Sequence, residues 1–171
     1  MLNKTRRLAF SLALATVLFL GLSSSSHAST QGRQFQLDGG FGVFVGTDGV
    51  DANFDFSLEP EYFFTEHTSL AFRLDLTAGH ITTMQLGGRF RYYFDIPNHD
   101  KVNLYIGAGI GGVINFDGGD FGDAALPVFG WQYDLGQHFK IGSDVSFDIT
   151  FNSHNVGFAA RLMPVVLKWA F

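Results

Sequence analysis

The stretch MPVVLKWAF, residues 163–171, decides the fold of this chain. Apolar or aromatic side chains stand at every second position in it, namely Met163, Val165, Leu167, Trp169 and Phe171. Because successive side chains of a β-strand point to opposite faces, this period of two predicts a strand with one apolar face. A partner that adds a strand could read alternate side chains in pockets, so Trp169 and Phe171 are the expected assembly signal of a membrane barrel.

The first residues predict a secretory signal peptide. Three basic residues, Lys4, Arg6 and Arg7, precede an apolar stretch at about 8–22, and Ser26-His27-Ala28 supplies the small residues that a signal peptidase reads. This stretch is shorter than the ~20 apolar residues that a membrane-spanning helix needs. We therefore expect residues 1–28 to be cleaved and residues 29–171 to form one outer-membrane barrel domain.

The expected mature chain is acidic. Three of the 11 basic residues lie within residues 1–28, so 8 basic residues remain against 16 acidic ones. Nucleic acid is therefore not an expected partner, because phosphate binding needs a basic surface. The chain contains no cysteine, which excludes disulfides and cysteine-ligated metals. No cofactor is expected.

Eight segments show the strand period, and they cover residues 34–45, 53–64, 68–77, 82–94, 102–113, 125–135, 139–151 and 157–171. Their lengths suit tilted membrane strands, and bacterial barrels have even strand numbers. In hydrocarbon, only helices and closed barrels satisfy every backbone polar group. The sequence thus predicts an all-β fold, an eight-stranded antiparallel up-and-down transmembrane β-barrel. A soluble lipocalin-like barrel with an apolar lumen is the alternative. Pro60 predicts a bulge or a broken pair, because proline cannot donate to the ladder.

Aromatic residues gather at one expected rim of the barrel. With the amino terminus in the periplasm, the connections after the second, fourth and sixth segments are periplasmic, and the others face outward. The ends of the even-numbered segments carry the residues of an expected periplasmic aromatic girdle, which are Tyr62, Phe64, Tyr92, Phe94, Trp131, Tyr133 and Trp169. Such girdles mark the boundaries of the apolar membrane band.

Opposite charges fall on the expected inward faces of the second to fourth segments. They form a predicted lumen charge network of Asp55, Glu59, Glu61, Arg73, Asp75, Arg89 and Arg91. Glu59, Arg73 and Arg89 are expected at one level, with Glu61 and Arg91 nearer the periplasmic rim. An eight-stranded barrel is only wide enough for side chains, so these charges must pair with one another. We therefore predict a plugged polar lumen, with a gated ion path as the alternative.

The chain resembles the small eight-stranded outer-membrane barrels of the OmpA and OmpX type. The resemblance covers the whole mature chain and rests on the signal peptide, the alternation, the stretch NLYIGAG at 103–109 and the closing KWAF at 168–171. It implies location in the outer membrane of a Gram-negative envelope. It also implies outer-membrane lipid, lipopolysaccharide and the barrel assembly machinery as partners. Adhesive members of the group look to have long external hairpins, whereas the longest connection expected here is 114–124.

Two external segments suggest alternatives with specific chemistry. The loop from Asp117 to Asp123 holds three carboxylates among glycines and is expected to be a solvated acidic loop, with Ca²⁺ binding as the alternative. Ser153-His154, with Asp148 as the nearest inward acid, raises the alternative of a lipid A-modifying hydrolase. The order Asn152-Ser153-His154-Asn155 lacks the His-x-Ser-Asn arrangement of the lipid A deacylase family.

The sequence therefore predicts an integral outer-membrane barrel with a structural or envelope-integrity role, and not an enzyme. No catalytic, cofactor-binding or metal-ligating residue is assigned, because the histidines at 67, 80, 99 and 138 are scattered over both rims. The protein is expected to be a monomer. A small-solute channel and a surface-interaction protein remain further alternatives.

Overall fold

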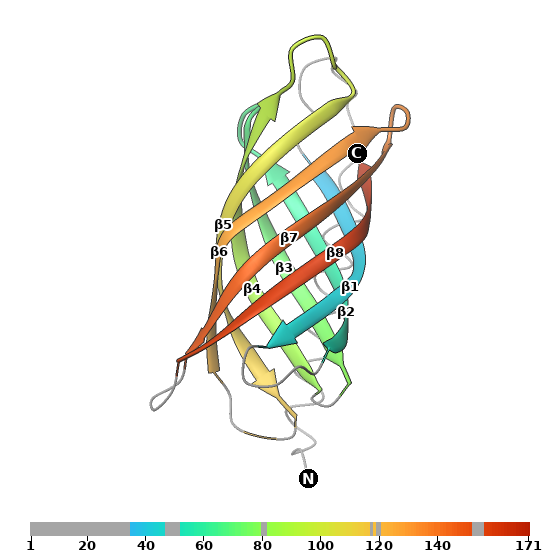
Figure 1. Cartoon of the computed structure of the whole chain (residues 1–171). Coiled ribbons are helices and arrows are strands. Elements are labelled where there is room, and N and C mark those ends of the chain that lie inside the picture. Colours follow the sequence, from blue (N-terminus) through green and yellow to red (C-terminus); the bar gives the residue numbers. More distant parts are fainter. Residues whose placement is uncertain (1–34, 47–51, 80–81, 117, 119–120, 152–155) are drawn as a thin grey trace. The chain divides into compact units, whose positions relative to one another are not determined.

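Eight antiparallel strands form a closed barrel (Figure 1) in the computed structural model, which describes residues 35–46, 52–79, 82–116, 118, 121–151 and 156–171. The strands are β1 (Phe35–Gly46), β2 (Ala52–Phe63), β3 (Thr68–Ala78), β4 (Thr83–Asp95), β5 (Val102–Asn115), β6 (Phe121–Asp134), β7 (Phe139–Phe151) and β8 (Val156–Ala170). Each strand pairs with its neighbours in sequence, and β1 pairs with β8. The predicted eight-stranded antiparallel barrel is confirmed. The predicted signal peptide, residues 1–28, lies outside the described residues.

Within the described part of the chain, no helix is long and apolar enough to cross a membrane.

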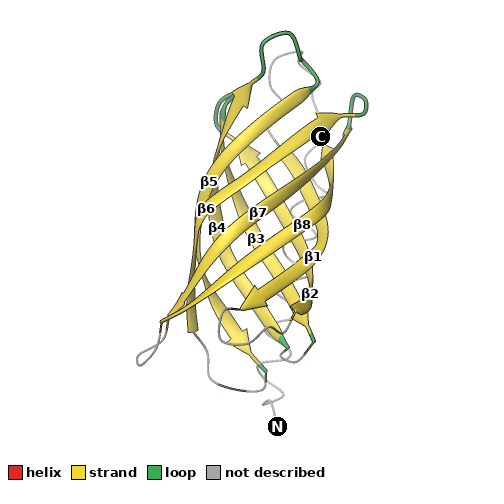
Figure 2. Cartoon of the chain, in the orientation of Figure 1, coloured by secondary structure: helices red, strands yellow, loops and turns green. Residues whose placement is uncertain are grey.

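The connections at both ends of the barrel are short. The β2–β3, β4–β5 and β6–β7 connections lie at one end together with the end of β8 (Figure 2), and we call this end the C-terminal rim. The opposite rim has connections at 47–51, 79–82, 116–120 and 152–155. The predicted bounds of the longest outward connection, 114–124, are wrong, because β5 ends at Asn115 and β6 begins at Phe121. Gly112 pairs with Gly122 and Val113 with Phe121, so the ladder continues into this segment.

The exterior of the barrel is apolar and the interior is polar. On β3, Leu70, Phe72 and Leu76 are each at least 44% exposed, whereas Arg73 and Asp75 on the alternate positions are at most 3% exposed. A soluble lipocalin-like barrel would have the opposite arrangement, so the structure contradicts that alternative. An apolar exterior is what a barrel surrounded by hydrocarbon requires.

Two prolines mark places where strands carry an extra residue. The β8 register shifts by one residue on both of its neighbours, between Leu162 and Val165 against β1 and between Met163 and Val166 against β7, around Pro164. The β6 register shifts in the same way between Ala125 and Val128, around Pro127. Proline lacks the backbone N–H of the ladder, and bulges are where strands accommodate it. Beyond each extra residue, the positions that would continue the inward alternation point outward instead. This changes the face predicted for Met163 and the start predicted for the sixth strand.

Two sequence assignments are corrected by these bulges. Met163 is 2% exposed and lies inside, while Val165 is 45% exposed and lies outside, so the outward run begins at Val165. The sixth strand starts at Phe121, not at Ala125. A bulge inverts the relation between odd and even positions, which a strict period of two cannot anticipate.

Pro60 interrupts pairing without a bulge. Leu37 of β1 faces Pro60, but on the other side the β2–β3 pairing omits Glu59 and Pro60. The register is unchanged across this gap, because Leu58 pairs with Leu74 and Glu61 with Ala71. Of the two predicted outcomes, the structure shows the broken pair.

Aromatic side chains pack inside the barrel beside the C-terminal rim. The ring of Tyr93 lies 5.3 Å from that of Phe63 and 5.2 Å from that of Tyr105. Tyr105 and Val128 are buried in the same cluster. A Cβ atom on Gly130 would overlap the Tyr105 ring, so glycine is required here for the close approach of that ring to β6.

Replacing Gly130 by alanine is expected to lower the unfolding free energy by about 1–3 kcal/mol, because the added methyl group overpacks the Tyr105 ring. Urea unfolding in lipid vesicles measures the change. Gly88→Ala is the matched control, since a Cβ at Gly88 meets nothing within 4 Å. Equal unfolding midpoints for the two variants would contradict the packing of Tyr105 against β6.

Candidate functional site: the charged lumen

The lumen contains eight carboxylates and five cationic side chains, each no more than 5% exposed. The carboxylates are Asp38, Asp55, Glu59, Glu61, Asp75, Asp123, Asp144 and Asp148, and the cations are Arg73, Arg89, Arg91, Arg161 and Lys168. Buried charges are tolerated when they are paired and hydrogen-bonded. The contacts among these side chains therefore define the site.

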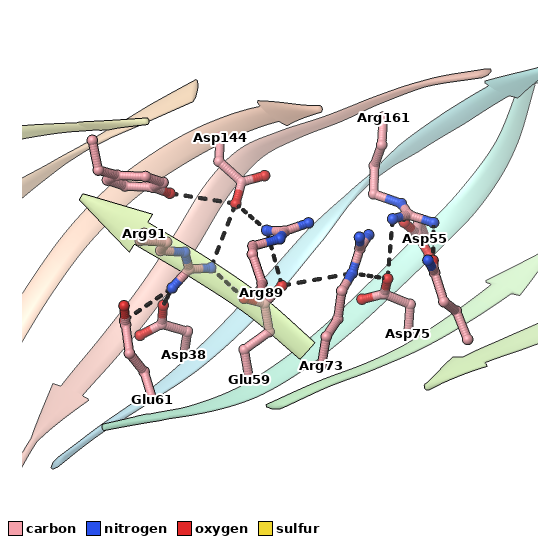
Figure 3. A network of polar contacts seen from close by, with 12 residues as sticks. Asp38, Asp55, Glu59, Glu61, Arg73, Asp75, Arg89, Arg91, Asp144 and Arg161 are labelled. Atoms are coloured by element: carbon pink, nitrogen blue, oxygen red, sulfur yellow. Dashed lines mark hydrogen bonds and ion pairs between the residues drawn. The ribbon is translucent and has the colours of Figure 1, made fainter. Parts of the chain in front are cut away.

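Arg91 of β4 contacts four carboxylates (Figure 3). Its Nη1 lies 2.9 Å from Asp38 Oδ2 and 2.9 Å from Glu61 Oε2. Its Nη2 contacts Glu59 and lies 3.9 Å from Asp144 Oδ2. Lys168 Nζ lies 3.0 Å from Asp38 Oδ2. Asp38 and Glu61 also accept hydrogen bonds from neutral side chains, which are Gln36, Ser69 and Tyr93. Charge-assisted hydrogen bonds of this kind are the stronger ones in proteins.

A second layer forms around Glu59 of β2. Arg89 Nη1 lies 3.1 Å from Glu59 Oε1, and Arg73 Nε lies 3.7 Å from the same oxygen. Arg89 Nη1 also donates to Asp144 Oδ2 of β7 at 3.0 Å, and that oxygen accepts from Tyr105 Oη at 3.3 Å. The layer thus ties together strands from both halves of the chain.

A third group lies toward the opposite rim and centres on Arg161 of β8. Its Nη1 lies 3.1 Å from Asp75 Oδ2 and 3.1 Å from Asp148 Oδ2, and its Nε contacts Asp55. Arg73 also contacts Asp75 and so links this group to the Glu59 layer (Figure 3). The charges therefore form one continuous network along the lumen.

All seven residues of the predicted network lie in the lumen and contact at least one other charge of the network. The structure places Glu59, Arg73 and Arg89 in contact, and Glu61 next to Arg91, which is the predicted order of levels. The buried charges of the lumen also include six residues outside the predicted network, which are Asp38, Asp123, Asp144, Asp148, Arg161 and Lys168.

Two different reasons explain these omissions. Asp38, Asp144, Asp148 and Lys168 fall on the polar phase of their strands, so counting inward charges on every strand would have found them. Arg161 lies beyond the bulge at Pro164, and Asp123 lies beyond the bulge at Pro127. Alternation cannot be extended across a bulge, so sequence alone contained no signal for the last two.

The residues of the predicted girdle lie on the exterior near the C-terminal rim. Each is at least 37% exposed. Neighbouring rings are in contact: centroids lie 5.3 Å apart for Tyr62 and Phe64, and 4.9 Å apart for Tyr92 and Phe94. Trp169 and Phe171 are stacked, with centroids 5.6 Å apart. Their roles in the membrane interface and in assembly stay predictions.

The structure describes only part of the two alternative sites, the acidic loop from Asp117 to Asp123 and the hydrolase site at Ser153-His154. The prediction that Asp123 belongs to a solvated loop is wrong, because Asp123 lies in β6 and is 2% exposed. Asp117, Asp120, Ser153 and His154 lie outside the described residues. Asp148 is paired with Arg161, so that arginine already holds the acid that a catalytic histidine would need. Among the residues that the structure describes, no three histidine or carboxylate side chains form a metal site.

Comparison with known families identifies the group. Residues 14–161 match the family described as "Outer membrane protein beta-barrel domain". The chain belongs to this family. Membership indicates the outer membrane as the location of the protein. The predicted resemblance to small eight-stranded outer-membrane barrels is confirmed, and no curated protein matches the chain.

Three solved structures share the barrel fold of this chain. Neisserial surface protein A is 14% identical, covers 80% of this chain and 96% of its own, and has a TM-score of 0.64. The N-terminal barrel of Pseudomonas aeruginosa OprF is 17% identical, with coverages of 82% and 100% and a TM-score of 0.56. Yersinia pestis Ail is 16% identical, with coverages of 82% and 100% and a TM-score of 0.51. Identities this low show a shared fold alone.

Replacing Arg91 by methionine is expected to destabilise the barrel by about 3–5 kcal/mol, because four buried carboxylates lose a cationic partner. Methionine keeps an unbranched apolar stem in the same space. Urea unfolding in vesicles measures the loss, and Lys101→Met in the exposed β4–β5 turn is the control. An unfolding midpoint equal to that of the control would show that Arg91 does not hold the network together.

Deleting Phe171 is expected to reduce the amount of folded protein in the membrane. The Phe171 backbone N–H donates to Phe35 O at 3.0 Å, and its ring stacks on Trp169, so the deletion removes contacts at the seam of the barrel. The fraction that keeps its folded mobility on an unheated gel is the measurement. Phe139→Leu, at the same rim on another strand, is the control; equal folded yields would contradict a special role of the terminal residue.

Proposed function

We propose that the protein is an exported, monomeric outer-membrane barrel that supports the envelope mechanically and has a closed lumen. The observation that carries this proposal is the network of thirteen charged side chains, all at most 5% exposed, that runs through the interior. Such a core holds the eight strands together and leaves little room for a solute. A channel would instead need an unobstructed path, which belongs to barrels of about 16 strands.

The free space along the lumen supports closure. Two of the cavities that border the network have volumes of about 10 and 20 Å³. Each has room for about one water molecule. The charges that line the lumen are held by partners on other strands, so an opening would have to break several ion pairs at once. A gated ion path would need other interactions to replace the ion pairs that are lost on opening.

The connections at the opposite rim argue against adhesion. With the amino terminus in the periplasm, this rim faces outward, and its connections at 47–51, 79–82, 116–120 and 152–155 are short. They contain Asp48, Asp51, Asp117 and Asp120 but no lysine or arginine. One solved structure of Ail is a complex with the heparin analogue sucrose octasulfate, a polyanion. An acidic rim does not suit that kind of ligand.

The surroundings proposed for the barrel follow from its exterior. An apolar wall with aromatic residues at the C-terminal rim suits outer-membrane lipid and lipopolysaccharide. The terminal residues Trp169 and Phe171 suit docking by strand addition to the barrel assembly machinery. We assign no cofactor and no enzymatic activity, and Asp148 supports this because Arg161 occupies it.

Planar-bilayer recording tests the closed lumen. The purified barrel is expected to give no stable large conductance, because the charge network fills its interior. Arg91→Met serves as the comparison, since loss of a cation at the centre of the network would allow brief openings. A stable large conductance of the unmodified protein would overturn the closed lumen.

A deletion strain tests the envelope role. Cells without the protein are expected to admit detergents and large hydrophobic antibiotics more readily, and the unmodified gene and His154→Ala are both expected to restore the barrier. Mass spectrometry of lipid A from the same strains separates the hydrolase alternative. Loss of an acyl chain that depends on His154 would replace the structural role by an enzymatic one, and an unchanged barrier in the deletion strain would contradict envelope support.

A further inference from the structure

Each of the three connections at the C-terminal rim (Figure 2) contains a histidine. His67 lies in the β2–β3 connection, His99 in the β4–β5 connection and His138 in the β6–β7 connection. His99 and His138 are exposed, and the side chain of His67 is 41% exposed. The sequence suggests histidines scattered over both rims, but the structure brings these three to one rim. Histidine is the residue type that ordinarily gains a positive charge as the pH falls from about 8 to 5.

Two of these histidines lie against the aromatic girdle. The ring of His67 lies 6.1 Å from that of Tyr92. His138 Nδ1 lies 3.1 Å from the carbonyl oxygen of Ala170, the residue after Trp169. Aromatic girdles lie at the level of the lipid headgroups. With the girdle at the membrane boundary, these imidazoles therefore lie where the phosphates of a lipid leaflet are found.

The fixed charges of this rim are mostly acidic. Outside the lumen, the described residues include two cationic side chains, Lys101 and Lys140, and both belong to this rim. The rim also has four side-chain carboxylates, those of Glu66, Asp95, Asp100 and Asp134. With neutral histidines, the rim therefore has more carboxylates than cations and repels an anion. Two lysines and three protonated histidines make five cations against the same four carboxylates.

The charged neighbours of the histidines leave two of them available to an outside anion. His67 Nδ1 lies 3.9 Å from Asp95 Oδ2, so Asp95 shares its charge. Among the described residues, no carboxylate forms an ion pair with His99 or His138. Asp134, which lies beside both connections, is paired with Lys140 at 3.4 Å, and its backbone N–H donates to Lys101 O.

The contact of His138 with the end of β8 orients its ring. A protonated imidazole has two N–H donors. One donor, at Nδ1, is directed at the Ala170 carbonyl oxygen, and Nε2–H is then left for an outside acceptor. Hydrogen bonds from a cationic imidazole to a phosphate are charge-assisted and therefore among the stronger ones.

We propose that the C-terminal rim binds the phosphates of anionic phospholipids, and that protonation of His67, His99 and His138 switches this binding on. The lipid phosphodiester stays ionised between about pH 8 and pH 5, so the histidines set the pH dependence. Affinity rises as the pH falls, because each histidine gains a positive charge. Acidification thus anchors the barrel more firmly in its leaflet. This inference rests on the proposed placement of the rim at the periplasmic boundary of the outer membrane.

Titration with a soluble lipid tests the site. The folded barrel in zwitterionic micelles is titrated with dihexanoyl phosphatidylglycerol at about pH 8 and about pH 5.5, on either side of the range in which histidine gains its charge. NMR chemical shifts of the rim residues give the dissociation constant. One basic group near an anionic lipid changes affinity about fivefold, so we expect at least about fivefold tighter binding at the lower pH. Dihexanoyl phosphatidylcholine and inorganic phosphate are the comparison ligands, and both are expected to bind more weakly.

The decisive variant combines His67→Gln, His99→Gln and His138→Gln, because glutamine stays polar and neutral at both pH values. It is expected to bind phosphatidylglycerol equally weakly at both. Lys101→Gln is the matched control at the same rim. Lysine keeps its charge over this range, so this variant should weaken binding at both pH values and retain the pH dependence.

Should the triple variant fold poorly, single variants replace it. His99→Gln and His138→Gln are each expected to reduce the pH dependence, and His67→Gln to reduce it less because Asp95 shares its charge. An affinity that does not change with pH, or a pH dependence that survives in the histidine variants, would overturn the proposal. Equal affinity for inorganic phosphate would overturn the assignment to lipid. Conductance and envelope permeability do not enter this titration, so its failure leaves the closed lumen and the envelope role intact.

Discussion

The pairing of β1 with β8 is the constraint on which the rest of the structure depends. A sheet surrounded by hydrocarbon cannot leave an unpaired edge, because each unsatisfied backbone group costs several kcal/mol. The seam extends from Gln36 opposite Ala170 to Gly46 opposite Ala159, and the Phe171 backbone N–H adds a bond to Phe35 O. Closure also brings Asp38 opposite Lys168, so the two ends of the barrel sequence meet through an ion pair inside the lumen.

Closure at eight strands then determines how the charged side chains of the lumen pair with one another. The interior of such a barrel has room for side chains and little else, so one guanidinium must serve several carboxylates. Arg91 contacts four of them and Arg161 contacts three. Sharing connects strands that are not neighbours, since Arg89 of β4 reaches Asp144 of β7. The polar core therefore does the work that an apolar core does in a soluble protein, and stability and a closed lumen have the same origin.

The uneven distribution of charge separates the two halves of this core. Near the C-terminal rim, carboxylates are supported by Lys168, Arg91 and neutral donors such as Tyr93. Toward the opposite rim, Asp123 has an amide as its partner, and hydroxyl groups border a small cavity. The carboxylates of the first half are therefore paired with cations, whereas Asp123 in the second half depends on a neutral amide.

Alternation in the sequence by itself determined the strand number, the direction of the apolar face and most of the aromatic rim, because a period of two is a local property of each segment. It also placed Glu59, Arg73 and Arg89 at one level, since these strands are consecutive and regular. Only the tertiary structure decided which carboxylate meets which cation across the barrel. Arg161 and Gln85 are 76 positions apart in sequence yet hydrogen-bonded. Their meeting depends on closure and on the bulges at Pro127 and Pro164, which change the inward phase of β6 and β8 and which no local pattern records.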